Sequence, residues 1–103
     1  MRFEVLRLIS PDHPSLPGHF PGAPLIPGVV ILDEVAAALH EWRQNCQLSG
    51  VRSVKFRAPL RPEQPFTISL SVTSKDAGEV SFYCRAEERV IVEGRLAVIW
   101  GAK

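Results

Sequence analysis

The sequence lacks several features that would assign it to a class at once. Its two cysteines, Cys46 and Cys84, stand far apart, so there is no CxxC pair for redox chemistry or zinc binding. A formal charge of +1 gives no general attraction to nucleic acid or to a membrane surface. No apolar run reaches the roughly 18 to 20 residues that span a bilayer, because Asp33 and Glu34 interrupt the best candidate. The first residues, MRFEVLRL, lack the pattern of a secretory signal, so we expect reduced thiols in a cytoplasmic protein.

The length of 103 residues fits a single domain, and its core is small enough that a partner chain would add useful burial. Apolar and polar residues alternate along most of the second half, as is typical of strands with one buried face. Strands are predicted over residues 2–9, 51–56, 66–74, 80–87 and 90–100. The last three follow one another through short turns and therefore predict an antiparallel meander whose apolar face needs a cover.

One long helix is predicted over residues 28–46, after Pro27. Helical spacing relates Leu32, Val35, Leu39, Trp42 and Cys46. The first three turns are apolar nearly all round, so we expect other elements to enclose them. The predicted fold class is α+β, with one long central helix wrapped by an antiparallel sheet of about five strands. This is the hotdog architecture.

A stiff loop is predicted before the helix. Six of the nine prolines stand between positions 11 and 27, where each fixes one backbone angle and lacks a donor. A loop of this length in a small domain is typical of a functional segment. It contains His13 and His19.

Two segments carry a resemblance to a known family. GHFPGAPLIPGVVILDEVA resembles the signature of the FabZ and FabA 3-hydroxyacyl-(acyl carrier protein) dehydratases, which is close to GHFPxxPxxPGVLxxE or D, and the acid after His19 is Asp33. VKFRAPLRPEQPF resembles the family segment RFKRPVxPGD that follows. Because the first predicted strand begins at residue 2, we expect no N-terminal helical segment like that of typical FabZ proteins. In this the sequence is most similar to the short ApeI-type dehydratases of aryl polyene clusters.

The resemblance implies an enzyme that dehydrates 3-hydroxyacyl thioesters in fatty-acid or polyene-type lipid biosynthesis, without a cofactor. His19 would be the base and Asp33 the acid, whose protonated form an apolar environment favours. Backbone N–H groups of Gly28 and Val29 would stabilise the charge on the thioester oxygen. Because the family's histidine and acid come from different protomers, the resemblance also implies a homodimer or a heterodimer with another hotdog chain, with an apolar tunnel for the acyl chain.

Two positions depart from the family pattern. Ala37 stands where the family usually carries a glutamine that orients the acid. Glu34 replaces a small residue after the acid, where it could reach a polar edge, contact the partner chain or interact with the charge of Asp33. Glu34 is also the alternative acid, and the pair could instead form an exposed edge of the helix.

Four cations, Arg52, Lys55, Arg57 and Arg61, fall within ten residues without an intervening acid. Such a run is most often a solvated face, and nucleic-acid binding would need a stronger charge bias. An acyl carrier protein is acidic, so these residues are also candidates for carrier docking.

The remaining candidates receive simpler interpretations. His13 and His40 are assigned structural roles, and the set His13, His19, His40 and Asp12 has no recognised metal-ligand spacing, so no metal site is predicted. The cysteines are expected to pack as small hydrophobes. Two other functions stay open: a catalytically silent hotdog subunit of a heterodimeric dehydratase, and a hotdog acyl thioesterase.

Overall fold

The computed structural model describes residues 2–9, 25–74 and 78–101 of the chain. Over these residues it contains one helix and five strands. Their bounds are β1 Arg2–Arg7, α1 Gly28–Trp42, β2 Cys46–Phe56, β3 Phe66–Ser74, β4 Glu79–Ala86 and β5 Arg89–Trp100.

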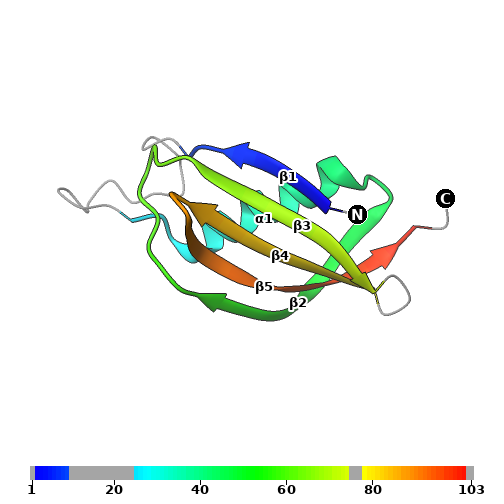
Figure 1. Ribbon diagram of the computed structural model, residues 1–103. Helices are drawn as coiled ribbons and strands as arrows, with labels where there is room; N and C mark the ends of the chain where they lie inside the picture. The colour runs from blue at the N-terminus through cyan, green and yellow to red at the C-terminus, as the bar shows by residue number, and fades with distance from the viewer. Residues whose placement is uncertain (1, 10–24, 75–77, 102–103) are drawn as a thin grey trace.

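The five strands form one antiparallel sheet in the order β1-β3-β4-β5-β2 (Figure 1). The consecutive strands β3, β4 and β5 pair with their neighbours along the chain, which confirms the predicted meander. The first strand adds to one side of the meander and β2 to the other, so β1 and β2 are the two edges of the sheet.

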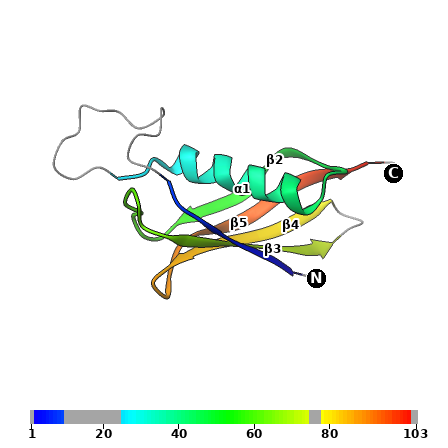
Figure 2. The same ribbon diagram turned by 90° about the horizontal axis from the view of Figure 1, so that it is seen from above.

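The helix α1 lies across one face of the sheet (Figure 2) and covers the apolar side chains of the meander. The predicted α+β hotdog class is confirmed. Alternation places every second residue of β4 in the core, as expected for a strand with one buried face. The principal core residues are Val30, Ile31, Val35, Ala38 and Leu39 of the helix, with Phe66, Ile68, Leu70, Val80, Phe82, Cys84, Val92, Leu96 and Val98 of the sheet.

The helix ends earlier than its sequence pattern predicts. Arg43 has left the helical conformation, with φ −135° and ψ 94°, although its N–H still bonds to the Leu39 carbonyl at 2.8 Å. Cys46 begins β2 and pairs with Trp100, so it belongs to a strand and not to the helix. The predicted helix 28–46 and the predicted strand start at residue 51 are both wrong, because pairing with β5 takes this segment into the sheet.

The expected enclosure of the first helical turns is also wrong for the described part of the chain. Val29 is 64% exposed, and Asp33, Ala37 and His40 are exposed as well. Their spacing of four, four and three residues puts them on one face of α1. That face points away from the sheet, since Ile31, Val35, Ala38 and Leu39 are buried on the opposite side.

Both cysteines are buried and free, which confirms their interpretation as small hydrophobes. Burial raises the pKa of the Cys84 thiol to about 12. Burial also raises the pKa of Cys46, while the nearby Arg43 cation acts in the opposite direction.

Candidate active site

The N-terminus of α1 presents the backbone groups proposed for thioester binding. The Pro27 carbonyl accepts bonds from the N–H groups of Val30, at 3.0 Å, and Ile31, at 3.4 Å. Gly28 and Val29 precede these donors, so their N–H groups stand at the positive end of the helix dipole. The N-terminal turn carries no acidic residue and no side-chain cap.

An apolar pocket adjoins this helix terminus. It has a volume of about 360 Å³ and lies between α1 and the chain that follows β2. Phe56 closes over Gly28 there, because a Cβ atom added to the glycine would lie 2.5 Å from the tip of the phenyl ring. Gly28 is therefore the residue that allows this close approach. The lining consists of Leu25, Ile26, Gly28, Ile31, Phe56, Arg57, Ala58, Pro59 and Leu60.

Asp33 lies one helical turn beyond Val29 on the outward face of α1. Its side chain is exposed in the single chain, so the apolar surroundings expected for this carboxyl are absent from the described residues. The position is open to a partner chain or a substrate. Ala37 follows on the same face, one turn further along, where its methyl group offers no hydrogen bond to the carboxyl.

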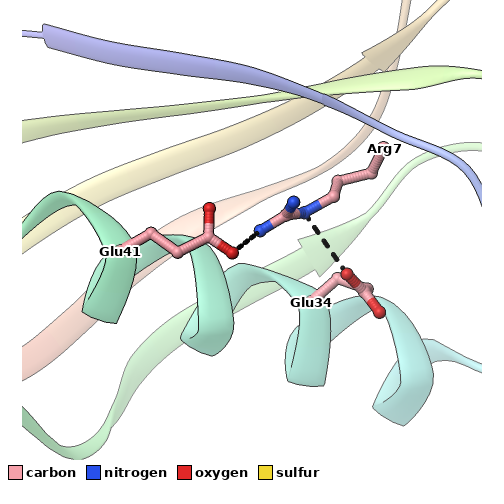
Figure 3. Close-up of polar contacts among 3 residues, drawn as sticks. All are labelled: Arg7, Glu34 and Glu41. Atoms are coloured by element: carbon pink, nitrogen blue, oxygen red, sulfur yellow. Dashed lines mark hydrogen bonds and ion pairs between the residues drawn. The ribbon is translucent and has the colours of Figure 1, made fainter.

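The neighbouring carboxylate, Glu34, points in another direction. It turns toward β1, where Arg7 Nε lies 3.4 Å from Glu34 Oε1. The same guanidinium donates a hydrogen bond of 2.5 Å from Nη2 to Glu41 Oε2 (Figure 3). Of the possibilities left open by the sequence, Glu34 therefore takes the contact with a polar edge. We name Arg7, Glu34 and Glu41 the Arg7 clamp.

The histidine of the predicted dyad lies outside the described residues. His19 and His13 both belong to residues 10–24, so the structure does not bring His19 and Asp33 together and the dyad stays a prediction. His40 is exposed near the end of α1, on the same outward face as Asp33.

Two of the four candidate docking cations form ion pairs with acids of the sheet. Arg52 Nη1 bonds to Glu79 at 3.2 Å, and Arg57 bonds to Glu93. Lys55 and Arg61 are exposed.

The edge strand β2 was missed as a feature of the site. Leu48, Val51, Val54 and Phe56 face the same side of the sheet as the core, yet they are between 39 and 50% exposed. Of the four, Phe56 packs against the start of α1 at Gly28. Register shifts occur between Leu48 and Gly50 and between Val51 and Ser53. The three-residue spacing of Val51 and Val54 was a usable signal, since it breaks the alternation as a β-bulge does.

Other site classes find no support in the described part of the chain. Over residues 2–9, 25–74 and 78–101, no group of three or more His, Cys, Asp or Glu side chains could hold a metal ion. Among the same residues, no helix is long and apolar enough to cross a membrane.

Comparison with known proteins gives a consistent assignment. The family model described as ApeI dehydratase matches residues 2–95. The chain is 31% identical to the 3-hydroxyacyl-(acyl carrier protein) dehydratase FabZ of Ehrlichia canis, over 89% of this chain and 71% of that protein. It is 30% identical to the FabZ of Haemophilus influenzae, over 77% of this chain but only 60% of the relative.

Among solved structures, the dehydratase heterocomplex ApeI:P from Xenorhabdus doucetiae superposes with a TM-score of 0.80 at 21% identity, over 94% of this chain and 86% of that chain. This agreement establishes the hotdog fold. Together with the match over residues 2–95, it shows that the chain belongs to the ApeI-like dehydratases, a FabZ-type hotdog family.

Proposed function

We propose that this chain dehydrates 3-hydroxyacyl thioesters on an acyl carrier protein to trans-2-enoyl thioesters, in fatty-acid or polyene-type lipid biosynthesis. The observation that carries the proposal is the arrangement of the two adjacent carboxylates. Asp33, which stands at the family's acid position, is exposed on the outward face of α1, whereas Glu34 is engaged with Arg7. This favours Asp33 over Glu34 as the acid.

The reaction needs one proton acceptor and one proton donor. His19 takes the proton from the carbon next to the thioester carbonyl, and the electron pair left behind forms the double bond to the next carbon. The bond from that carbon to its hydroxyl breaks as Asp33 donates a proton, so one water molecule leaves. His19 then holds the extra proton and Asp33 has lost one, and exchange with solvent restores both.

The thioester oxygen gains negative charge while the proton is removed. The N–H groups of Gly28 and Val29 are suited to stabilise it, because they lie at the positive end of α1 beside the apolar pocket. In this proposal the pocket receives part of the acyl chain.

A second hotdog chain completes the proposed site. In the single chain Asp33 is open and β2 is an edge strand with exposed apolar side chains. Both features suit coverage by a partner that contributes the base, in a homodimer or a heterodimer. The ApeI:P protein from Xenorhabdus doucetiae, whose fold this chain shares, is a dehydratase heterocomplex.

The acidic carrier protein is proposed to dock on the cations of β2 and the chain that follows it. Lys55 and Arg61 are the stronger candidates, since Arg52 and Arg57 already contact Glu79 and Glu93. Their role is transient attraction and not tight binding.

The test uses the purified chain with a 3-hydroxyacyl-carrier protein, and mass spectrometry follows the loss of water. We expect activity in the wild type, loss of activity in His19→Ala and Asp33→Asn, and retention in Glu34→Gln. Release of free acid and carrier thiol instead of the enoyl product would reassign the chain as a thioesterase. Loss of activity in Glu34→Gln alone would move the acid to Glu34.

A silent subunit is the second candidate, and Ala37 favours it. Its methyl group occupies the outward face where a hydrogen-bonding side chain would orient the acid. The distinguishing result is an inactive chain that becomes active when a hotdog chain co-purified from its host is added.

A further inference from the structure

The edge strand β1 is attached to α1 at both of its ends. Phe3, Val5 and Arg7 share the half-buried side of the strand. At the start of β1, the Phe3 ring stacks on Trp42 with centroids 5.8 Å apart and an interplanar angle of 12°. At its end, Arg7 contacts Glu34 and Glu41 (Figure 3). These two contacts limit the rotation of α1 about its own axis.

The Arg7 clamp follows from helix geometry. Glu34 and Glu41 are seven residues apart, so they lie on the same face of α1 about 10 Å from one another along the axis. The guanidinium contacts both carboxylates, and the Arg7 side chain is only 21% exposed. Its Nε atom is fully buried. One cation is thus shared by two anions, and the clamp has a net negative charge of one.

Asp33 stands next to Glu34 in the chain but about 100° further round the helix. Other charges near these two carboxylates come from few elements. His40 and Glu41 belong to α1 itself, and Arg7 is the cation that β1 turns toward Glu34. No residue of β3 titrates. β2, at the opposite edge of the sheet, contributes the buried Cys46 thiol and the cations Arg52 and Lys55. Within the described chain, the compensation of the Glu34 charge therefore depends on Arg7.

We propose that Arg7 is a positioning residue for the acid Asp33. By holding Glu34 toward β1 and compensating part of its charge, Arg7 keeps the neighbouring anion turned away from Asp33, which remains the outward-facing carboxylate. Removal of Arg7 would release Glu34 to approach Asp33, and the like charge would favour the protonated form of Asp33. The inference rests on the proposed function for its catalytic meaning, but the electrostatic effect is measurable without substrate.

The first experiment is a pH titration of the Asp33 side-chain carboxyl by carbon NMR, with Asp33→Asn used to assign the signal. In Arg7→Gln the titration midpoint should move to higher pH, because a Glu34 anion without its cation disfavours a second negative charge beside it. The titration midpoint should return to its wild-type value in the double variant Arg7→Gln/Glu34→Gln. Arg2→Gln, which removes a cation from the other end of β1, should leave it unchanged.

An unchanged midpoint in Arg7→Gln, or a shift that remains in the double variant, would overturn the inference. Should Arg7→Gln not fold, Arg7→Met serves in its place, since methionine keeps the apolar part of the side chain and removes the charge. An upward shift is expected there too, and its absence would overturn the proposal.

The second experiment measures kcat of the same variants against pH. A general acid works in its protonated form, so the alkaline limb of the profile should move to higher pH in Arg7→Gln and return in the double variant. A purely structural role would lower activity at every pH without moving the limb, which would overturn the catalytic part. If the NMR midpoint moves but the wild type releases no water, the clamp stands and the proposed function fails.

Discussion

The substitution Gly94→Ala should weaken the pairing of β2 with β5 and so destabilise the fold. Gly94 of β5 pairs with Val54, next to the register shift in β2. A Cβ atom added there would lie 2.2 Å from the Ser53 carbonyl oxygen and 2.9 Å from the Phe82 ring. The first of these neighbours is backbone, so the contact can be relieved only by moving the strand itself.

The magnitude follows from the geometry. Overpacking of a well-packed region destabilises by about 1 to 3 kcal/mol, and a backbone contact this short belongs to the upper part of that range. For a domain of about this size, each kcal/mol lowers the melting temperature by roughly 4 to 8 °C. We therefore expect Gly94→Ala to melt about 10 to 20 °C below the wild type, measured by circular dichroism.

Gly50→Ala is the matched control. Gly50 lies in β2 itself, and a Cβ atom added to it meets nothing within 4 Å. Neither glycine has a positive φ, so the two variants differ in contacts and not in backbone strain. Gly50→Ala should stay within about 1 kcal/mol of the wild type, with a gain in stability more expected than a loss. Equal melting temperatures for the two variants would refute the reasoning.

Three further outcomes are expected. Because burial raises the pKa of Cys84 to about 12, little of its thiol is ionised at pH 8.5. Iodoacetamide should therefore modify Cys84 far more slowly in the folded protein than in urea, and equal rates would contradict the burial. The double variant Lys55→Glu/Arg61→Glu should raise KM several-fold for a substrate bound to the acyl carrier protein and leave KM unchanged for the same acyl group bound to coenzyme A. Equal effects on the two substrates would exclude carrier docking at these residues. Gly28→Ala should lower kcat/KM at least tenfold, because the added methyl group would block the thioester. The melting temperature should fall by only a few degrees, because the half-exposed Phe56 ring can move aside, and a wild-type kcat/KM in this variant would show that Gly28 is not part of the site.

The sheet was predictable where one face of a strand is buried and the other is not. In β4 the alternation of Val80, Phe82 and Cys84 with polar residues is reproduced in the burial of each side chain. Local pattern and tertiary environment agree there, and the predicted meander is confirmed. The start of α1 after Pro27 was also predictable, because a proline at a helix start lacks only an N–H that no helical hydrogen bond needs.

The end of α1 was not predictable from its pattern. Cys46 continues the spacing of Leu39 and Trp42, and a thiol packs as readily against a sheet as against a helix. The deciding interaction is the pairing of Cys46 with Trp100, more than fifty residues away in the chain. Long-range pairing of this kind leaves no trace in a window of local sequence.

The ion pairs of the site were hidden for the same reason. The alternation of Phe3, Val5 and Arg7 puts the arginine on the half-buried side of β1, which signals a partner, but nothing in the pattern says that the partner is Glu34. Similarly, the charge run from Arg52 to Arg61 suggests one basic surface. Acids brought in by β4 and β5 engage two of its members and leave Lys55 and Arg61 exposed.

The exposed outward face of α1 and the exposed apolar side chains of β2 have one physical explanation. An apolar helix face with a carboxylate at its centre, and an edge strand with four exposed apolar side chains, are both unfavourable for a small domain that stays alone. A hotdog partner placed along β2 and over α1 would bury both, and would give Asp33 the apolar surroundings that favour its protonated form. If Asp33 is the acid and a partner supplies the base, as proposed, the chemistry and the assembly are coupled, because only the assembled pair would give the acid the environment that its role requires.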